Sequence, residues 1–510
     1  MKPAAWPLQA DAMEVAALIA GGQIGALEAL EHAVARAQRL DPQLNALCNP
    51  AVDSARRDAR EIDDELVAAR RSPGTLERVR RERPFLGVPT LLKDLSTAAL
   101  GIPSTMGSRL FGRIEWQVDC ELVRRYRRAG FVLFGRTTSP EMGISPSTEA
   151  LAYGGPTRNP WNTAYSAGGS SGGAAAAVAA RIVPIAHASD GAGSIRIPAA
   201  CCGLVGLKPS RGLIPMGPLA GEAWGGLATE HVVSLSVRDS AAALDASAGI
   251  DVGAPYAAPP YAASLAAVEA ITAGGPLRPL RIALLSTTLD GAPVHPEVAA
   301  AVRETAALLA ALGHRVEAAA PKLSTEEIVR PMMNVIACGT AMVVDIELRR
   351  RGRALQSDEI EATTRGAWEY GRSLSGPQYL ESVSAMHRLD RRIGAFFEGS
   401  ESHAGFDAML MPVLAEPPAP LGRWAMSNPD FMDYRLGPRG LIHYSPFTPL
   451  ANMTGQPAIS LPLAMSAQAL PIGVQLVGRF GADTLLLQLA AQLELARPWR
   501  DRIAPLAGSL

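Results

Sequence analysis

The stretch AGGSSGGAAAAVAARIVPIAHASDGAGSIRIPAACCGLVGLKPSRG (167–212) is the most informative part of the sequence. Its alanine-rich segment (174–181) is typical of a helix, and the apolar run that follows (182–189) is typical of a buried strand. A Gly-rich turn lies at each end of this unit, with Ser170 in the first turn and Ser194 in the second. Because glycine permits close backbone approaches, this order predicts a packed α/β unit that presents two serines.

Outward from this stretch, helical and strand patterns alternate over the rest of the chain. Helices are predicted over 11–71, 121–130, 174–181, 236–250, 296–313, 322–400 and 482–496. Strands are predicted over 85–95, 131–135, 182–189, 278–286, 314–321 and 456–480, a buried strand that runs into a Pro-rich loop over 406–420, and a long loop over 139–173. The class is therefore α/β, and because no repeat or linker interrupts the chain, one large domain is expected. We divide it into an N-terminal helical segment packed on the core (1–75) and a main domain (76–500).

Composition excludes several classes of protein. Of 510 residues, 48% are hydrophobic and 19% are charged, which is enough for a large core and rules out wholesale disorder. A net charge of −1 argues against nucleic acid as a partner. The five cysteines have no CxxC pair and no zinc-site spacing, so no metal site is expected. No run of 18 apolar residues occurs and the amino terminus is a poor signal peptide, so we expect a cytoplasmic protein without a membrane partner.

Lysine is rare in this chain, which makes each lysine informative. Of the 48 basic residues only four are lysine, and one of these, Lys93, lies in the apolar segment FLGVPTLLKDL (85–95). Arginine stays protonated at any useful pH, whereas a buried lysine can lose its proton. Lys93 is therefore a candidate for acid–base chemistry.

Three chemistries compete for the two Gly-rich turns. A phosphate-binding loop is disfavoured because no GK[ST] follows the glycines. A nucleophile elbow at Ser170 fits G-x-S-x-G, but the segment before it is a loop, and the available partners, Asp407 and His443, are in no distinctive setting. The third reading is a serine nucleophile activated by lysine without histidine.

The motifs GGSSGG, SDGxGSIRIPA and CGLVGLKP, with GVPTLLKDL before them and PFTPLANMTGQPAISLP and LPIGVQLVGR after them, resemble the amidase signature family. The resemblance covers about residues 80–495. It implies a central mixed β-sheet with helices on both faces and a metal-free Ser–cis-Ser–Lys triad. On this chain the triad would be Lys93 as the base, Ser170 as the bridge and Ser194 as the nucleophile.

The resemblance also implies an oxyanion hole built from the backbone N–H groups of Gly191, Ala192, Gly193 and Ser194. Many family members have Thr-Gly-Gly-Ser at this point, whereas this chain has Gly-Ala-Gly-Ser. Ala192 keeps its N–H, but its methyl group narrows the loop. Asp190 and Arg196 flank the turn and are expected to form a structural ion pair.

Within the family, HASDGxGSIRIPA and CCGL resemble the branch that contains the 6-aminohexanoate cyclic dimer hydrolases. This resemblance places Ile144, Ser145 and Cys338 at the substrate, with core packing as the alternative for Cys338. The loop 421–447, with Trp424, Tyr434 and Tyr444, is a candidate cap, although packing is the favoured role for these rings.

The substrate is left open at this point. The resemblance implies a small-molecule amide, with 6-aminohexanoate oligomers, anilides and carbamates (urethanes) as the options, and a homodimer is compatible with it. A second reading is the glutaminase subunit of a tRNA amidotransferase complex, although the Met-Gly-Ser-Ser run associated with that subunit is missing here.

Overall fold

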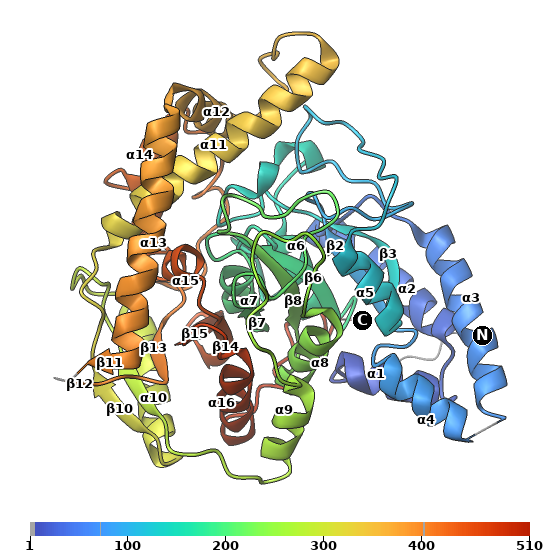
Figure 1. The fold of residues 1–510 in the computed structure, drawn as a ribbon. Coiled ribbons are helices and arrows are strands. Elements are labelled where there is room, and N and C mark those ends of the chain that lie inside the picture. The colour runs from blue at the N-terminus through green and yellow to red at the C-terminus, as the bar shows by residue number, and fades with distance from the viewer. Residues whose placement is uncertain (1–5, 72, 401–402, 510) are drawn as a thin grey trace.

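The computed structural model describes residues 6–71, 73–400 and 403–509, and its N-terminal part is helical as expected. Its helices are α1 (Ala12–Ala20), α2 (Ala26–Leu44), α3 (Val52–Ala69) and α4 (Pro73–Glu82). Helix α1 begins at a capping box in which Asp11 accepts the N–H of Glu14 and the Glu14 carboxylate accepts the N–H of Asp11. This blue part of the chain lies at one side of the molecule in Figure 1.

A small sheet joins the N-terminal segment to the main body. It has the order β1 (Leu47–Cys48), β3 (Val132–Thr137), β2 (Pro89–Lys93), and helix α5 (Glu121–Ala129) precedes β3. Strands β2 and β3 are parallel, and β1 pairs antiparallel with β3. Every residue of β2 is buried, and the strand ends at Lys93 as predicted. The Lys93 N–H donates to His187 Nδ1 at 3.1 Å, which connects β2 to the neighbouring large sheet.

The large sheet has eight strands and is mixed, as the family resemblance implied. Its order is β10 (Arg315–Ala318), β9 (Arg281–Leu284), β13 (Ala408–Pro412), β15 (Pro471–Gly478), β14 (Ala458–Met465), β7 (Val205–Lys208), β8 (Thr229–Ser234), β6 (Ile185–Asp190). Strand β9 pairs parallel with β10 and β13, and the other pairs are antiparallel. Strands β7 and β8 were not predicted from the sequence.

Helices cover both faces of this sheet. They are α6 (Gly172–Ala179), α7 (Arg196–Cys202), α8 (Val237–Ser247), α9 (Ser264–Thr272), α10 (Pro296–Ala311) and α16 (Asp483–Ala496). On β15, a Cβ at Gly473 would lie 2.4 Å from Ala200 of α7, and a Cβ at Gly478 would lie 3.0 Å from Leu486 of α16. Since these glycines are an odd number of positions apart, α7 and α16 pack on opposite faces.

A second helical group packs beside the sheet in the upper left of Figure 1 and supplies one wall of the site described below. It consists of α11 (Thr325–Arg351), α12 (Ala362–Ser373), α13 (Gly376–Glu398), α14 (Phe431–Leu436) and α15 (Pro449–Thr454), so the prediction of mostly helical structure over 322–400 is confirmed. Helix α11 is long and apolar enough to cross a membrane by length and composition, but buried helices of protein cores pass the same test. Half of the most apolar 18-residue stretch of α11 is buried inside the protein.

The segment predicted as a long loop, 139–173, contains short regular elements. They are the 3₁₀ turns η1 (Glu141–Gly143) and η2 (Leu151–Tyr153) and the antiparallel pair β4 (Arg158–Asn159) and β5 (Asn162–Ser166). The remaining short elements are η3 (Leu441–His443) and the pair β11 (Gly399–Ser400) and β12 (His403–Ala404). Strands this short have no sequence pattern that separates them from a loop.

Candidate active site

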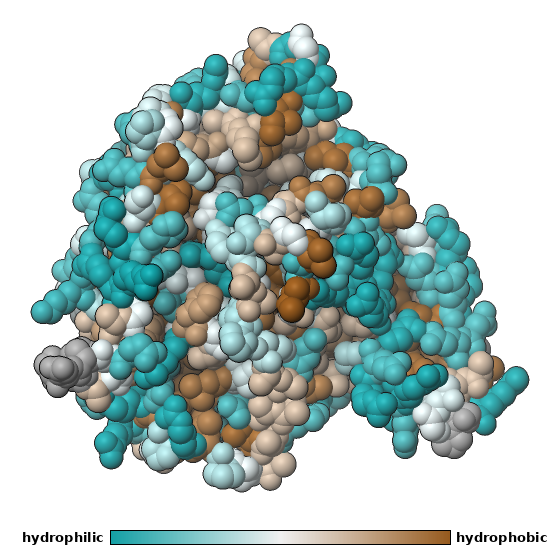
Figure 2. Space-filling model, in the orientation of Figure 1, coloured by the Kyte–Doolittle hydropathy of each residue, from teal (hydrophilic) through white to brown (hydrophobic). Residues whose placement is uncertain are grey.

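Three elements bring the predicted triad residues to one place. Lys93 ends β2, Ser170 lies in the turn before α6, and Ser194 lies in the turn between β6 and α7. The Lys93 Nζ donates to Ser170 Oγ at 2.7 Å, and the Gly169–Ser170 peptide bond is cis. Ser170 and Ser194 both line a cavity of about 680 Å³ beneath α11. Figure 2 shows the face of the molecule hollowed at this place.

The environment of Lys93 favours the neutral amine. Its side chain is fully buried. Burial lowers the pKa of Lys93 to about 7, while the negative charges of Asp190 and Glu230 act in the opposite direction. Besides Ser170, the amine donates to Ser189 Oγ at 3.0 Å. A neutral fraction near pH 7 is what a base at this position requires.

Asp94, which follows Lys93 in the sequence, is directed elsewhere. Its carboxylate accepts the Thr105 N–H at 2.9 Å and the Tyr153 hydroxyl at 2.7 Å. As the acid adjacent to Lys93 in the sequence, Asp94 would keep Lys93 protonated only if its carboxylate were held against the amine. The acids whose charges act on Lys93 instead come from β6 and β8, far away in the sequence.

Lys208 provides a comparison with Lys93. It is also buried, and burial together with Arg196 lowers its pKa to about 7. Its Nζ donates to the carbonyl of Pro209 at 2.7 Å. Within the described residues, Lys208 has no serine partner and lines neither cavity beside Ser194. A lowered pKa alone therefore does not mark a catalytic lysine, whereas contact with Ser170 separates Lys93 from Lys208.

The turn that carries Ser194 is organised by the buried carboxylate of Asp190. Arg196 donates to both of its oxygens, at 2.9 and 3.0 Å, so the expected ion pair is present. The side chain of Asn452 also donates to it, at 2.9 Å. Burial alone would raise the pKa of Asp190, but Arg196 and Asn452 hold that pKa well below its usual range. The carboxylate is therefore charged at neutral pH.

The same carboxylate removes one expected oxyanion donor. The Gly193 N–H donates to Asp190 Oδ1 at 2.6 Å and is not free to receive a substrate oxygen. In the described part of the chain, the N–H groups of Gly191, Ala192 and Ser194 have no protein acceptor. The predicted set of four donors is thus narrowed to three. The sequence did not predict this, because it did not indicate where the Asp190 side chain points.

Two glycines in this turn are required by their neighbours. A Cβ at Gly191 would lie 2.6 Å from the Trp224 ring, and one at Gly193 would lie 2.3 Å from Thr448 Oγ1. Gly193 also has φ +127°, which disfavours other residues. Position 192 does not require glycine, and the carbonyl of Ala192 accepts a hydrogen bond from the Thr448 hydroxyl at 2.7 Å. The departure from the usual Gly-Gly pair therefore falls at a position that tolerates a methyl group.

The three predicted substrate contacts divide between two cavities that both reach Ser194. Ile144 and Ser145 line a small cavity of about 40 Å³, whereas Cys338, on α11, lines the larger one. Ser145 is largely committed to the protein, because its Oγ lies 3.0 Å from the Tyr434 hydroxyl and 3.3 Å from the Trp424 carbonyl. Burial raises the pKa of Cys338, so its thiol is neutral at pH 7.

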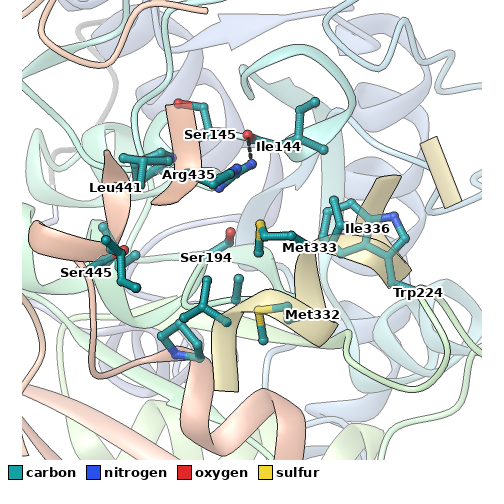
Figure 3. A pocket seen from close by; sticks show the side chains of 18 residues that line it. Ile144, Ser145, Ser194, Trp224, Met332, Met333, Ile336, Arg435, Leu441 and Ser445 are labelled. Carbon is teal, nitrogen blue, oxygen red and sulfur yellow. Dashed lines mark hydrogen bonds between the residues drawn. The ribbon is translucent and has the colours of Figure 1, made fainter. Parts of the chain in front are cut away.

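The aromatic residues of the loop 421–447 are packed rather than placed as a cap. Trp424, Tyr434 and Tyr444 are all buried. The rings of Trp424 and Tyr444 lie 5.3 Å apart, and the Tyr444 hydroxyl accepts the Ala419 N–H at 3.3 Å. The same loop instead places Arg435 in the small cavity, as Figure 3 shows. In a chain with so many arginines, no sequence signal could have singled out Arg435.

The nucleophile-elbow alternative lacks its partners. Asp407 is paired with Arg278 at 2.7 Å, and His443 is exposed. Neither residue lines a cavity that contains Ser170 or Ser194. Among the described residues, moreover, no group of three or more His, Cys, Asp or Glu side chains could hold a metal ion. The groups gathered at the two serines are thus an amine, hydroxyls and backbone N–H groups.

Comparison with known proteins finds relatives over most of the chain. A family model described as Amidase matches residues 28–487. The 6-aminohexanoate-cyclic-dimer hydrolase of Paenarthrobacter ureafaciens is 37% identical over 506 residues, which cover 96% of each chain. The match to this relative extends over nearly the whole chain.

Solved structures give the same picture. A 6-aminohexanoate cyclic dimer hydrolase complexed with substrate has a TM-score of 0.85 and 34% identity, covering 98% of this chain and 100% of that one. A bacterial aryl acylamidase of the amidase signature family has a TM-score of 0.84 and 27% identity, covering 98% and 99%. The fold and the sequence therefore point to one family.

Proposed function

This chain belongs to the amidase signature family of hydrolases that act on amide carbon–nitrogen bonds, and we propose that it cleaves a small-molecule amide through an acyl-enzyme on Ser194. The observation that carries the proposal is the 2.7 Å hydrogen bond from the buried Lys93 amine to Ser170, in a cavity that Ser194 also lines. A serine beside a Gly-rich turn needs a base to become a nucleophile, and a lysine with a pKa near 7 is one.

In the proposed first step, neutral Lys93 accepts a proton from Ser170 as Ser170 accepts one from Ser194. The Ser194 oxygen then attacks the amide carbonyl carbon. The N–H groups of Gly191, Ala192 and Ser194 stabilise the negative charge that develops on the carbonyl oxygen. In other enzymes the loss of one such donor costs about 3–4 kcal/mol of transition-state stabilisation, so these three groups are a major part of the proposal.

In the second step the carbon–nitrogen bond breaks as Ser170 returns a proton to the leaving amine. Water then adds to the acyl-enzyme. Ser170 and Lys93 take a proton from this water as they took one from Ser194, and the carboxylic acid leaves as Ser194 regains its proton. Over the whole cycle Lys93, Ser170 and Ser194 pass one proton to the leaving amine and take one back from the water, so the cycle requires no cofactor. Asp190 takes no proton in this scheme, because its contacts with Arg196, Asn452 and Gly193 serve to hold the turn.

The substrate class that we propose is a linear or cyclic amide such as a 6-aminohexanoate oligomer. The similarity to 6-aminohexanoate-cyclic-dimer hydrolases over 96% of the chain supports this choice. Cys338 in the larger cavity and Ile144 and Ser145 in the smaller one are the proposed contacts. The similarity to an aryl acylamidase makes anilides the second candidate substrates. Carbamates are a further candidate, because they would present a comparable carbonyl group to Ser194.

The test is a hydrolysis screen of linear amides, cyclic amides, anilides and carbamates, with intact-protein mass spectrometry after rapid quenching. We expect turnover of at least one class and an acyl adduct on the peptide that contains Ser194. A fluorophosphonate should label the same peptide, and Ser194→Ala should abolish both adduct and turnover. Labelling of Ser170 instead would contradict the assignment of Ser194 as the nucleophile.

The glutaminase-subunit reading predicts a different result. Such a protein would co-purify in a fixed ratio with partner subunits and would release ammonia from glutamine. A single-component protein that turns over simple amides excludes that reading.

A further inference from the structure

The two cavities that meet at Ser194 differ in charge. Of the eighteen residues that line the small cavity, Arg435 is the only charged one, and the others are mainly apolar. The larger cavity contains no basic side chain, and its charged residues are Glu222 and Glu230. A substrate that spans Ser194 therefore meets a cation on one side and carboxylates on the other.

Arg435 is buried and has no acidic partner among the residues that the structure describes. It is 8% exposed and lies in the last turn of α14. One of its terminal nitrogens donates to the carbonyl of Ile144, and its Nε has no hydrogen-bond partner in the described part of the chain. Its guanidinium lies 5.2 Å from the Phe431 ring centre and 5.5 Å from that of Tyr434. Figure 3 shows Arg435 and Ser194 projecting into the same space from two different segments.

Two other buried arginines, Arg136 and Arg196, are satisfied by the protein itself, whereas, among the described residues, Arg181 also has unpaired nitrogens but lines neither cavity beside Ser194. Arg196 is paired with Asp190, and the Arg136 guanidinium donates to four backbone carbonyls. Burial lowers the pKa of Arg435 only to about 10, so it stays charged at neutral pH. A buried charge without a counter-ion is unfavourable, and a guanidinium that lines a cavity, as that of Arg435 does, is suited to bind an anion there.

We propose that Arg435 binds a carboxylate on the substrate, on one side of the amide bond that Ser194 attacks. The planar guanidinium matches a carboxylate through paired hydrogen bonds. A cavity of about 40 Å³ suits a group this small. The inference rests on the proposed function only in taking Ser194 as the position of the scissile bond.

The proposal has a consequence for the rest of the substrate. A positively charged end group would be repelled from the small cavity and would fit the larger one, where Glu222 and Glu230 are the charged residues. A neutral amide would leave the guanidinium unpaired when it displaces water. We therefore expect amides that carry a carboxylate to be better substrates than neutral amides of the same shape.

Two matched substrate pairs test this, one for each side of the scissile bond. On the acyl side, glutaric acid monoanilide is compared with 5-methylhexananilide, in which an isopropyl group replaces the carboxylate. On the amine side, 4-acetamidobenzoate is compared with 4-isopropylacetanilide. The wild-type enzyme should favour the carboxylate in one pair by about tenfold to a hundredfold in kcat/KM. Wild-type enzyme with no preference in either pair would overturn the proposal.

Variants assign the preference to Arg435. Arg435→Gln should abolish it, mainly through a higher KM for the anionic member, and Arg435→Lys should keep part of it. Arg439→Gln is the matched control, since it removes an exposed arginine from the same segment and should keep the preference. If Arg435→Gln lowers kcat/KM equally for both members of a pair, Arg435 only supports the Ile144 segment and the proposal is wrong.

A binding measurement separates this proposal from the proposed function. Glutarate, but not glutaramide, should raise the melting temperature of the wild-type protein and slow fluorophosphonate labelling of Ser194, and Arg435→Gln should remove both effects. Melting-temperature effects without any labelling or turnover would support Arg435 as an anion site while refuting the proposed function. Turnover without discrimination in either pair would refute only the role of Arg435.

Discussion

At the scale of single residues, the proposed hydrolytic mechanism depends on the ability of the Lys93 amine to be neutral. Lys93→Arg keeps a positive charge but removes the base, because a guanidinium stays protonated. We expect kcat to fall by about 10²- to 10⁴-fold, as far as in Lys93→Ala. Lys322→Arg is the matched control, because Lys322 is exposed. Circular dichroism should show that both arginine variants fold, and near-normal kcat in a folded Lys93→Arg enzyme would remove lysine from the mechanism.

The pH dependence follows from the same group. Burial lowers the pKa of Lys93 to about 7, so the amine is protonated and inactive below that pH and neutral above it. The value of kcat/KM, which reports the free enzyme, should therefore rise as the pH increases through about 7 and then level off. A profile measured with a neutral anilide keeps the substrate from titrating. A rate that falls over this range, or a rise centred near the ordinary lysine pKa of about 10.4, would contradict the assignment.

Cys338 is the predicted contact whose role is least constrained by its neighbours. It lines the larger cavity, and its Sγ lies 3.8 Å from the carbonyl of Gly371. Cys338→Ala should change KM by about threefold for substrates large enough to fill that cavity, with little change for acetanilide. Cys120→Ala, a buried cysteine remote from the cavity, is the control. A lower melting temperature with unchanged relative activities would identify Cys338 as core packing.

At the scale of elements, the unit formed by β6, the Ser194 turn and α7 was largely predictable. The alternation of an apolar run, a Gly-rich turn and a helix start is a local pattern, and the structure follows it over 185–202. Strand β8 was missed because Thr229, Glu230 and His231 give it a polar start. Those residues are nevertheless buried, since Glu230 accepts from Thr97 and meets His187, and both partners are distant in the sequence.

The same distinction between local sequence patterns and distant contacts explains which parts of the candidate site could be predicted. Lys93, Ser170 and Ser194 stand in recognisable motifs, so they could be found from the sequence. The hydrogen bond from the Gly193 N–H to Asp190 and the position of Arg435 in the small cavity depend on where side chains point after the chain has folded. Motifs identify the reacting groups, whereas the donors and charges around them come from tertiary packing.

The stability of the Ser194 turn should depend on Asp190. Asp190→Asn keeps the size of the side chain but leaves the buried Arg196 without its counter-ion. Breaking one partner out of a buried pair typically costs about 3–5 kcal/mol in the free energy of unfolding. Asp53→Asn, at a carboxylate that is 89% exposed, should be near neutral. Urea unfolding of both variants measures the difference, and equal midpoints would mean that Asp190 does not hold the turn.

At the scale of the whole molecule, the N-terminal segment is tied to parts of the chain that are far away in the sequence. Strand β1 adds to the small sheet that contains Lys93, and the N–H of Thr138 donates to the carbonyl of Ala46 at 2.9 Å. The long helix α11 similarly supplies part of the wall of the larger cavity. The site is thus assembled from segments of every third of the chain, and the relatives align along nearly its full length.

Arg36 tests whether this assembly folds as one unit. It is buried on α2, and its guanidinium donates to the carbonyls of Ala180 at 2.9 Å, Arg181 at 2.7 Å and Ala507 at 3.0 Å. Arg36→Met keeps the apolar stem but leaves all three carbonyls without this donor, and a buried unsatisfied group costs about 1–3 kcal/mol. We therefore expect the free energy of unfolding to fall by about 3 kcal/mol or more.

Arg39→Met on the same helix is the matched control, because Arg39 is exposed and should change that free energy by less than about 0.5 kcal/mol. If the N-terminal segment is integral to the core, Arg36→Met should lower a single unfolding transition, followed by fluorescence and by loss of Ser194 labelling together. If residues 1–75 instead form a unit that unfolds separately, a second transition should appear in which Ser194 still reacts. The coincidence of the two signals therefore decides whether the boundary expected at residue 75 divides the protein in solution.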